Sequence, residues 1–414
     1  MGPNLAALAW RNLWRNRRRT LITLGSIAFG VLLAVVMTGS ADWRWREVIN
    51  LVARMGGGHV TIQHPDYQER PALSRTVTLD PAAQARLQAV PGVEAWSMRV
   101  MGQAMLSTAR DSAGTMFLAF DPTRETPETL SVLSNLMEGE LFEGPDDKGI
   151  ILGDGLADVL GVGLGKKVVY TMTHKNGDIV TGLARVTGLV HTGSPTTDTS
   201  LCLLPLGAVR KVLGYGPDEG THVAVFVGDH RRAAAVAAAA GSALGPKVSA
   251  LTWAQAQPDL AGFITMKVNG MVVMELFMMV LIAAGIFNTM FVSVMERLRE
   301  FGVMLAVGAS PLTVFRLVIW ESALMGMAGI VLGAVITAWP YHYLATTGLD
   351  LSAKLGDSDL EVAGAAIEPV LKVALYPENA LFIAVAIVLA TMASGLYPAF
   401  RAGRVSPVET IKLI

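Results

Sequence analysis

The sequence predicts an α-helical membrane protein with four transmembrane helices and a large α+β extracytoplasmic domain inserted between helices 1 and 2. Three observations predict this fold class. Hydrophobic residues make up 52% of the 414 residues and charged residues only 16%, against about 25% charged in ordinary globular domains. Four stretches are long and apolar enough to span a bilayer, which takes about 20 residues. Between the first two stretches lies a long segment of ordinary soluble composition.

The four apolar stretches are each bounded by charged residues. The uncharged runs cover residues 20–41, 276–295, 322–349 and 379–400. The third run contains Pro340, so we expect its helix to end near residues 339–343 and to begin before Glu321, near Leu312. Glu321 then lies inside the helix, where it should face protein groups or the cytoplasmic boundary, because lipid exposure of a carboxylate is costly.

Lys and Arg residues near the ends of the spans predict the orientation. Basic residues gather before the first run, between the second and third, and after the fourth, whereas the segment between the third and fourth runs is mainly acidic. Both termini are therefore predicted to lie on the cytoplasmic side of the membrane. The predicted segments are a cytoplasmic interfacial helix (1–19), transmembrane helix 1 (20–41), a periplasmic domain (42–267), transmembrane helix 2 (268–295), a cytoplasmic coupling loop or helix (296–311), transmembrane helix 3 (312–343), a periplasmic loop (344–377), transmembrane helix 4 (378–400) and a cytoplasmic tail (401–414).

The segment before the first span has the pattern of an amphipathic helix. Four arginines share one side of a helical wheel and apolar residues take the other. The arginines are Arg11, Arg15, Arg18 and Arg19. Two interpretations remain open: a positively charged membrane anchor, and a contact with a cytoplasmic partner.

The periplasmic domain mixes short alternating strands with helices, which predicts two α+β subdomains, the second inserted at about 111–220. Expected strands include residues 59–63 and 223–227, and expected helices include 81–89, with Asp80 as N-cap, and 231–244. The glycine-rich stretch 161–167 lacks the pattern of a phosphate-binding loop and is expected to be a turn. The sequence predicts no catalytic, cofactor-binding or metal-ligating residue here, and the single cysteine, Cys202, is expected to be a small buried hydrophobe.

Four motifs spread along the chain resemble those of one known family. They are Trp10-Arg11-Asn12-Leu13-Trp14-Arg15-Asn16 with the following Thr20 to Leu24, Gly58 to Gln63 together with Ile151 to Ala157 and Leu160-Gly161-Val162, Glu296 to Gly302 with Ala306 to Ser310, and Tyr397 to Ala402 with Ser406 to Glu409. On these motifs the chain resembles the MacB/FtsX-type superfamily of ABC transporter permeases, and within it the lipoprotein-releasing (LolC/LolE-like) branch.

The resemblance implies a mechanotransmission permease. In this family two permeases, either copies or paralogues, bind cytoplasmic ABC ATPase subunits, which bind the ATP and Mg; this chain would hold no cofactor. The membrane helices would transmit the motion of the ATPases to the external domains. In the lipoprotein-releasing branch this motion extracts a lipoprotein from the outer leaflet and passes it to a periplasmic carrier. No Walker A motif occurs in the sequence, so the chain is not expected to be an enzyme by itself.

The predicted coupling loop carries charges of both signs, as suits docking into a protein cleft. Its candidate ATPase-coupling residues are Glu296, Arg297, Arg299, Glu300, Gly302, Gly308, Ala309 and Ser310. The alternative is a solvated turn with local ion pairs. In the third span, Gly329 and Gly333 form a small-xxx-small pair, which suits packing within the chain and dimerisation equally.

The outer ends of the first two spans are candidates for substrate access. Their residues, represented by Met37, Trp43, Met271 and Glu275, are apolar with a charged margin. Such a surface suits acyl chains below a polar protein body, although any pair of packed spans has similar residues at the interface.

Three function classes follow from the resemblance. The first is lipoprotein release. The alternative is a split MacB-like efflux permease for drugs, peptides or siderophores, which would need an adaptor. In the MacB branch the ATPase is fused at the N-terminus, whereas this chain starts almost at its first span, which favours the first class. A signalling permease is disfavoured because that branch has a much smaller external domain.

Overall fold

The computed structural model describes residues 5–351, 360–362, 365–367 and 370–404. Parts of the predicted segments 1–19, 344–377 and 401–414 lie outside the described residues, as does the motif from Ser406 to Glu409. The chain divides into two units. The helical unit comprises Met1–Arg44, Thr265–Leu351 and Val370–Ile414, and the soluble unit comprises Trp45–Ile264 and Ser352–Pro369.

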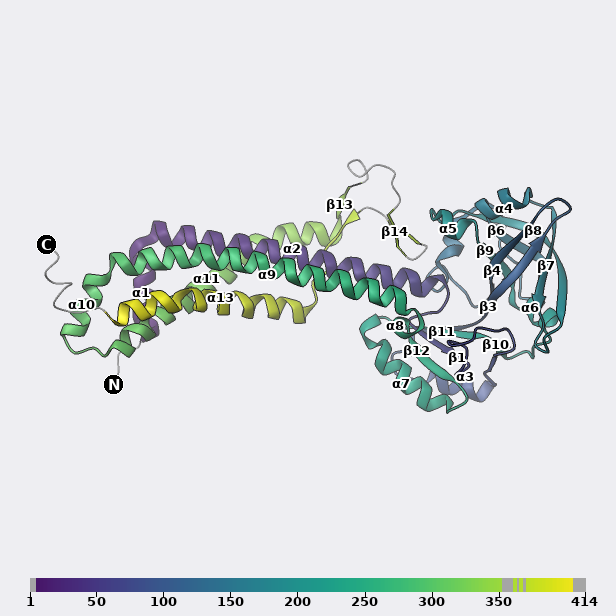
Figure 1. Cartoon of the computed structure of the whole chain (residues 1–414), viewed down its shortest axis with the longest axis horizontal. Helices are drawn as coiled ribbons and strands as arrows, with labels where there is room; N and C mark the ends of the chain where they lie inside the picture. The colour runs from purple at the N-terminus through teal and green to yellow at the C-terminus, as the bar shows by residue number, and fades with distance from the viewer. Residues whose placement is uncertain (1–4, 352–359, 363–364, 368–369, 405–414) are drawn as a thin grey trace. The chain divides into compact units, whose positions relative to one another are not determined.

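Within the described residues, four helices are long and apolar enough to cross a membrane (Figure 1). The same residues include three short helical segments of this unit, two at the N-terminal end and one between the second and third long helices. In chain order the helices are α1 (Leu5–Leu13), η1 (Trp14–Asn16), α2 (Arg17–Met55), α9 (Pro258–Glu296), α10 (Leu298–Ala306), α11 (Pro311–Thr346) and α13 (Pro377–Gly403). Because α2 ends at Met55 and α9 begins at Pro258, each contributes residues to both units.

Two glycines of α11 let it pack directly against α2. A Cβ atom added at Gly329 would lie 2.5 Å from Cγ2 of Ile27, and one at Gly333 would lie 2.6 Å from Cβ of Val31. Only glycine fits such a close approach. The resulting van der Waals contact matters because, inside a membrane, the hydrophobic effect does not drive helices together. The small-xxx-small pair is therefore used for packing within the chain.

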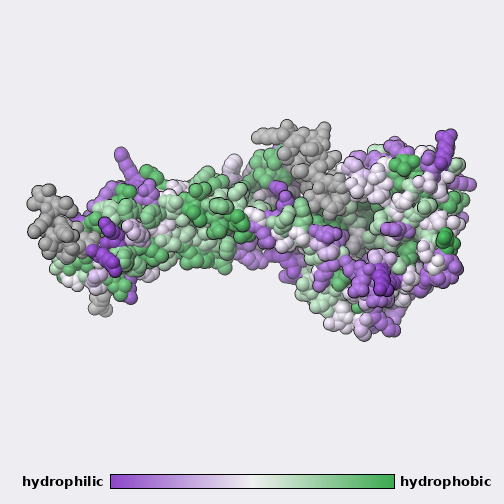
Figure 2. Space-filling view, viewed as in Figure 1, coloured by the Kyte–Doolittle hydropathy of each residue, from purple (hydrophilic) through white to green (hydrophobic). Residues whose placement is uncertain are grey.

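The N-terminal helix α1 lies against α11 through the apolar side of its predicted pattern. Ala9 and Leu13 are buried in the same apolar core as Phe301 and Val314. In Figure 2 the long helices of this unit carry an apolar surface, and hydrophilic residues gather at the end that carries α1 and α10. An apolar surface with a charged end is what a bilayer-spanning bundle requires.

Ten strands of the described residues form one sheet in the soluble unit. Its order is β12-β1-β11-β3-β4-β9-β6-β8-β5, with β7 pairing β3 and β8. The strands are β1 (Val60–Gln63), β3 (Ala95–Ser107), β4 (Ser112–Phe120), β5 (Leu136–Gly139), β6 (Gly149–Gly153), β7 (Lys167–Thr173), β8 (Ile179–Val190), β9 (Leu201–Pro205), β11 (His222–Phe226) and β12 (Ser249–Thr252). A separate pair is formed by β2 (Val77–Thr78) and β10 (Glu219–Gly220).

The long strand β3 connects two apolar cores. Residues 95–99 pair with β11, and residues 100–107 pair with β4. One core lies beside β1 and β11 and is covered by α3 (Pro81–Gln88) and α7 (Ala233–Leu244). The other lies beside β4, β6 and β9 and is covered by α4 (Asp154–Leu160) and α6 (Leu206–Leu213). The elements from β4 to β10 fall within the predicted insert 111–220, whose boundaries stay a prediction.

The remaining short helices of this unit are η2 (Ser131–Asn135), α5 (Pro195–Asp198), η3 (His230–Arg232) and α8 (Trp253–Ala256), and the helical unit adds a small strand pair, β13 (Leu349–Asp350) with β16 (Val370–Leu371). A further pair is β14 (Leu360–Val362) with β15 (Ala365–Ile367).

Local sequence signals agree closely with these elements. The Asp80 carboxylate accepts a hydrogen bond from the amide of Ala83 at 2.6 Å, which makes it the predicted N-cap of α3. Gly161 ends α4 in the left-handed conformation at φ 62°, so the glycine-rich stretch is a turn as expected. The predicted strands differ from β1 and β11 by one residue at an end, and the first residues of the predicted helix 231–244 belong to η3 instead.

Candidate functional site

The segment between α9 and α11 folds as a short helix with sharp ends. Ala309 N–H donates to the carbonyl of Met304 at 3.0 Å, closing α10. Gly308, directly before Ala309, has φ 103°, a backbone conformation that residues with a side chain disfavour. Ser310 then caps α11 by accepting from the amide of Thr313 at 3.2 Å. Three of the predicted coupling residues therefore shape the turn between the two helices.

A buried carboxylate anchors this segment to the bundle. Glu321 of α11 is only 4% exposed. Nη1 of Arg297 donates to both of its oxygens at 3.1 and 3.0 Å, and Nδ2 of Asn12 in α1 donates to one of them at 2.7 Å. A buried charge is tolerated when it is paired and hydrogen-bonded. The expectation that Glu321 faces protein groups is confirmed, and its partners come from both cytoplasmic segments predicted by the sequence.

Two ion pairs join the predicted N-terminal segment to the end of α9 and to α10. Arg15 pairs with Glu300, and both Nη atoms of Arg19 donate to Glu296 at 2.6 Å. Burial alone would raise the pKa of Glu300, but hydrogen bonds from Arg15 and Arg297 outweigh it and lower this pKa. Because both pairs are largely exposed to solvent, they contribute little to the stability of the fold. Glu296, Arg297 and Glu300 are thus engaged inside the chain.

The outer face of α10 carries different residues. Arg299 is exposed and forms no ion pair among the described residues. Val303 is 47% exposed and Val307 is 84% exposed. These three residues, spaced by four, lie on one face of the helix, and we call them the α10 outer face. Gly302, also predicted as a coupling residue, is buried on the opposite side. The sequence reasoning selected Arg299 and missed the two valines.

A second feature of the helical unit is an apolar groove of about 160 Å³ between α2, α9 and α13. Met37 and Glu275 line it, and the hydroxyl of Thr38 donates to Oε1 of Glu275 at the groove. The structure thus brings two of the four substrate-access candidates together. Trp43 instead lies 5.9 Å from the ammonium of Lys372, and neither Trp43 nor Met271 lines the groove within the described residues.

In the soluble unit a buried ion pair between Arg99 and Glu125 stabilises the fold. Arg99 is fully buried; its Nε and Nη2 donate to the two oxygens of Glu125 at 2.7 and 2.8 Å, and its Nη1 donates to the carbonyl of Gly56. This bond fixes the chain directly after α2 to the sheet. Cys202 is buried in the core, and burial raises the pKa of its thiol, as befits a small hydrophobe.

Two family descriptions together match nearly the whole chain. The MacB-like periplasmic core domain matches residues 20–243, more than half of the chain, and the FtsX-like permease C-terminal domain matches residues 272–407. The first match covers α2 and most of the soluble unit. The second covers α10, α11, α13 and most of α9.

Three curated relatives agree with these matches. The lipoprotein-releasing system transmembrane protein LolC of Xylella fastidiosa is 24% identical, with 99% of each chain covered. The corresponding protein LolE of Haemophilus influenzae is 21% identical, with 98% of each chain covered. The pyoverdine export ATP-binding/permease protein PvdT of Pseudomonas entomophila is 25% identical over 79% of this chain and 50% of its own length.

The matched domains, the four apolar helices and the full-length similarity to LolC and LolE agree with one another. The chain belongs to the MacB/FtsX-type superfamily of ABC transporter permeases, with a MacB-like periplasmic domain and an FtsX-like permease domain, and it resembles the LolC/LolE-like branch over its whole length.

Proposed function

We propose that this chain is the permease subunit of a mechanotransmission ABC transporter that releases lipoproteins from the outer leaflet of the bacterial inner membrane. A separate ATPase hydrolyses the ATP, and this chain turns that cycle into movement of its soluble unit. The observation that carries the proposal is the α10 outer face: an arginine and two exposed valines on a short helix that is anchored by the buried Arg297–Glu321 pair.

The residues of the α10 outer face are more typical of a protein interface than of a surface exposed to solvent. Val307 is among the most exposed apolar side chains of the described residues, and apolar residues beside an arginine are typical of the centre of protein interfaces. The anchor matters because a docking helix transmits force only if it is fixed to the helices behind it. Arg297 and Asn12 provide that link to α11 and α1 through Glu321.

The partners and orientation follow from the same proposal. The α10 outer face and both termini lie in the cytoplasm, where the ABC ATPase, and not this chain, binds ATP and Mg. The basic residues of the N-terminal segment support this orientation. A second permease, as a copy or a paralogue, completes the transporter, and a periplasmic carrier or adaptor receives the substrate. The predicted boundaries of the membrane spans belong to this proposal.

The substrate class rests on the groove and on the relatives. The groove is apolar along most of its lining and ends at Glu275, so acyl chains fit it better than a polar solute does. The similarity to LolC and LolE covers nearly all of each chain. The second candidate, efflux of a small molecule, is supported by the similarity to PvdT, which covers half of that protein.

Site-specific photo-crosslinking distinguishes the two candidates. A photo-reactive residue at Met37 would line the groove; the matched control is Val335, which is 69% exposed on α11 and does not line it. In bilayers that contain the ATPase, Met37 should capture a lipoprotein without ATP and lose it after ATP binds, while Val335 captures none. Equal capture at both positions contradicts lipoprotein release, and selective capture of a small solute at Met37 supports efflux.

A further inference from the structure

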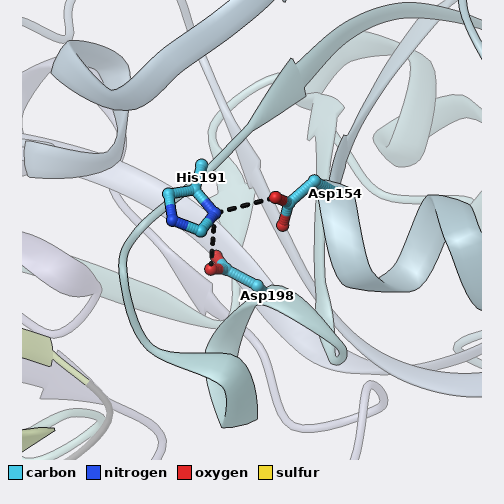
Figure 3. A group of neighbouring side chains, drawn as sticks. All are labelled: Asp154, His191 and Asp198. Atoms are coloured by element: carbon cyan, nitrogen blue, oxygen red, sulfur yellow. Dashed lines mark hydrogen bonds and ion pairs between the residues drawn. The ribbon is translucent and has the colours of Figure 1, made fainter. Parts of the chain in front are cut away.

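Three side chains meet at one edge of the sheet in the soluble unit (Figure 3). Strands β6 and β8 are parallel and neighbouring, with Gly153 paired to Val190. The next residue after each strand is therefore at the same edge, and these residues are Asp154 and His191. Asp198, at the end of the short helix α5, is the third member.

A close backbone approach brings Asp198 to this edge. A Cβ atom at Gly153 would lie 2.2 Å from the carbonyl oxygen of Asp198, and one at Gly155 would lie 2.9 Å from Cγ2 of Thr199. Only glycines on both sides of Asp154 permit α5 to lie this near to the start of α4. The three side chains are thus held together by the backbone and not by chance surface contact.

In each of the two aspartates, one carboxylate oxygen accepts hydrogen bonds that fix the side chain, and the other oxygen faces the His191 ring. Oδ1 of Asp154 accepts from the amide of Gly155 at 2.8 Å, and Oδ1 of Asp198 accepts from the amide and hydroxyl of Thr192 at 2.8 and 2.7 Å. Both Oδ2 atoms point toward Nδ1 of His191, at 2.7 Å for Asp154 and 3.3 Å for Asp198. Such outer bonds are what orient the ligands of a metal site.

One of these oxygens has an unmet requirement. Asp198 is only 3% exposed, and its Oδ2 is buried and accepts no hydrogen bond within the described residues. A buried acceptor without a partner destabilises the folded state, and does so more when it carries charge. A cation between the two Oδ2 atoms and Nδ1 would supply the missing partner and would offset the two negative charges at the same time.

From this geometry we propose that Asp154, His191 and Asp198 bind a divalent transition-metal ion, with Zn²⁺ as the best fit. One imidazole nitrogen and two carboxylate oxygens form a donor set that Zn²⁺ accepts at about 2.0–2.2 Å. Ca²⁺ prefers six to eight oxygen ligands and Mg²⁺ an octahedron of oxygens, so neither matches. This site was not expected from the sequence, which predicted no metal-ligating residue.

The spacing requires only a small adjustment. Ligand atoms of a tetrahedral Zn²⁺ site lie about 3.3–3.6 Å apart, given these bond lengths. The 3.3 Å between His191 and Asp198 fits already, and the 2.7 Å contact to Asp154 must open by about half an ångström. His191 is 55% exposed, so its ring has room to move and the ion keeps an open position for water. Binding displaces the proton that otherwise links Nδ1 to the carboxylate of Asp154.

The bound ion would connect three elements of the soluble unit: the end of β8, the start of α4 and the helix α5. Because an ion that binds the folded state but not the unfolded one stabilises the fold, Zn²⁺ should slow the opening of these segments. Its effect is local, since the other core of the unit, beside β1 and β11, contains none of the three ligands.

The test uses the full-length chain in detergent, purified with a tag that contains no histidine and stripped with EDTA. Zn²⁺ alone is titrated by calorimetry, and bound zinc is counted after dialysis. We expect one ion per chain and slower hydrogen exchange in residues 154–160 and 191–198. The visible spectrum of Co²⁺ in its place should show tetrahedral bands without a sulfur charge-transfer band, which excludes Cys202 as a ligand.

Two variants and one matched control decide the result. His191→Ala changes an exposed side chain, so the fold should survive it, while affinity should fall by more than the roughly 10–100-fold that loss of an outer partner costs. Asp198→Asn should weaken binding likewise. His64→Ala is the control: His64 is partly exposed and its Nδ1 lies 4.0 Å from one carboxylate, that of Asp66. Absence of saturable binding, or binding that His191→Ala leaves unchanged, overturns the proposal.

Discussion

Nη1 of Arg297 donates to both carboxylate oxygens of Glu321, at 3.1 and 3.0 Å, although 24 residues separate the two in the sequence. Arg297 comes directly before the short helix α10, and Glu321 lies within the long apolar helix α11. The pair therefore fixes one end of the predicted docking helix to the bundle.

Loss of Arg297 should destabilise the helical unit much more than loss of its neighbour Arg299. Arg297→Ala leaves the buried carboxylate of Glu321 without its charged partner, which costs about 3–5 kcal/mol. Arg299→Ala removes an exposed arginine and should change stability by less than about 0.5 kcal/mol. Thermal unfolding of the two variants in detergent, followed by size-exclusion chromatography, measures the difference. Equal stability would mean that the Arg297–Glu321 pair does not anchor the loop.

A charge swap tests whether Glu300 acts inside the chain or on the ATPase. Glu300→Lys places a third cation beside Arg15 and Arg297 and should reduce stimulation of the ATPase. If Glu300 acts by holding Arg15, the double variant Arg15→Glu/Glu300→Arg should restore most of the stimulation, because the pair reforms with opposite sign. No restoration would show that the negative charge of Glu300 meets the ATPase directly.

A charge on the α10 outer face should uncouple the transporter without unfolding it. Val303 is 47% exposed, so Val303→Asp removes little packing but places a carboxylate in the proposed docking contact. Binding to the ATPase should fall at least about tenfold, as expected for a group of about 1.4 kcal/mol or more at an interface centre. Pull-down and ATPase stimulation measure it, with Val335→Asp as the control on an exposed position of α11. Normal binding by Val303→Asp would mean that this face is not the docking surface.

Acid should destabilise the core beside β1 and β11 at a pH well above the range in which carboxylates titrate. Burial lowers the pKa of His59 and of His222 to about 4, and the nearby Arg99 contributes to the shift of His222. Unfolded histidine titrates near 6.5, so between pH 6.5 and 4 the unfolded state binds more protons. Stability is therefore full above pH 6.5 and falls as the pH drops toward 4, by up to about 1.4 kcal/mol per pH unit for each histidine.

Hydrogen exchange of peptides that cover β1 and β11, corrected for intrinsic rates, measures this pH dependence. Protection should decrease between pH 7 and pH 5, and His222→Gln should make the decrease shallower because one of the two titrating groups is gone. Protection that is constant over this range would contradict the buried, neutral state of these histidines.

The elements that the sequence predicted correctly depend on local pattern. Apolar runs marked the four long helices, Asp80 marked a helix start, and Gly161 marked a turn, because each signal is contained within a few residues. The prediction that Glu321 faces protein groups also rested on local sequence, because exposing a carboxylate in an apolar run to lipid is costly.

The missed features depend on contacts between distant segments. Glu296 and Glu300 were predicted to contact the ATPase. Their ion pairs with Arg19 and Arg15, which lie 277 and 285 residues away in the sequence, were not predicted. Val303 and Val307 were not singled out by the sequence, and the structure places both at the surface. Asp154, His191 and Asp198 meet only because β6 and β8 are parallel neighbours, a pairing that no local spacing reveals.

Release of a lipoprotein from a membrane tests the central claim most directly. Proteoliposomes would contain this chain, its partner ATPase and a fluorescent lipoprotein, with a soluble acyl-chain-binding acceptor outside. ATP should transfer the lipoprotein to the acceptor, ADP should not, and the Val303→Asp variant should abolish the transfer. Lipoprotein that stays in the membrane while the wild-type complex hydrolyses ATP at full rate would contradict lipoprotein release as the function of this permease.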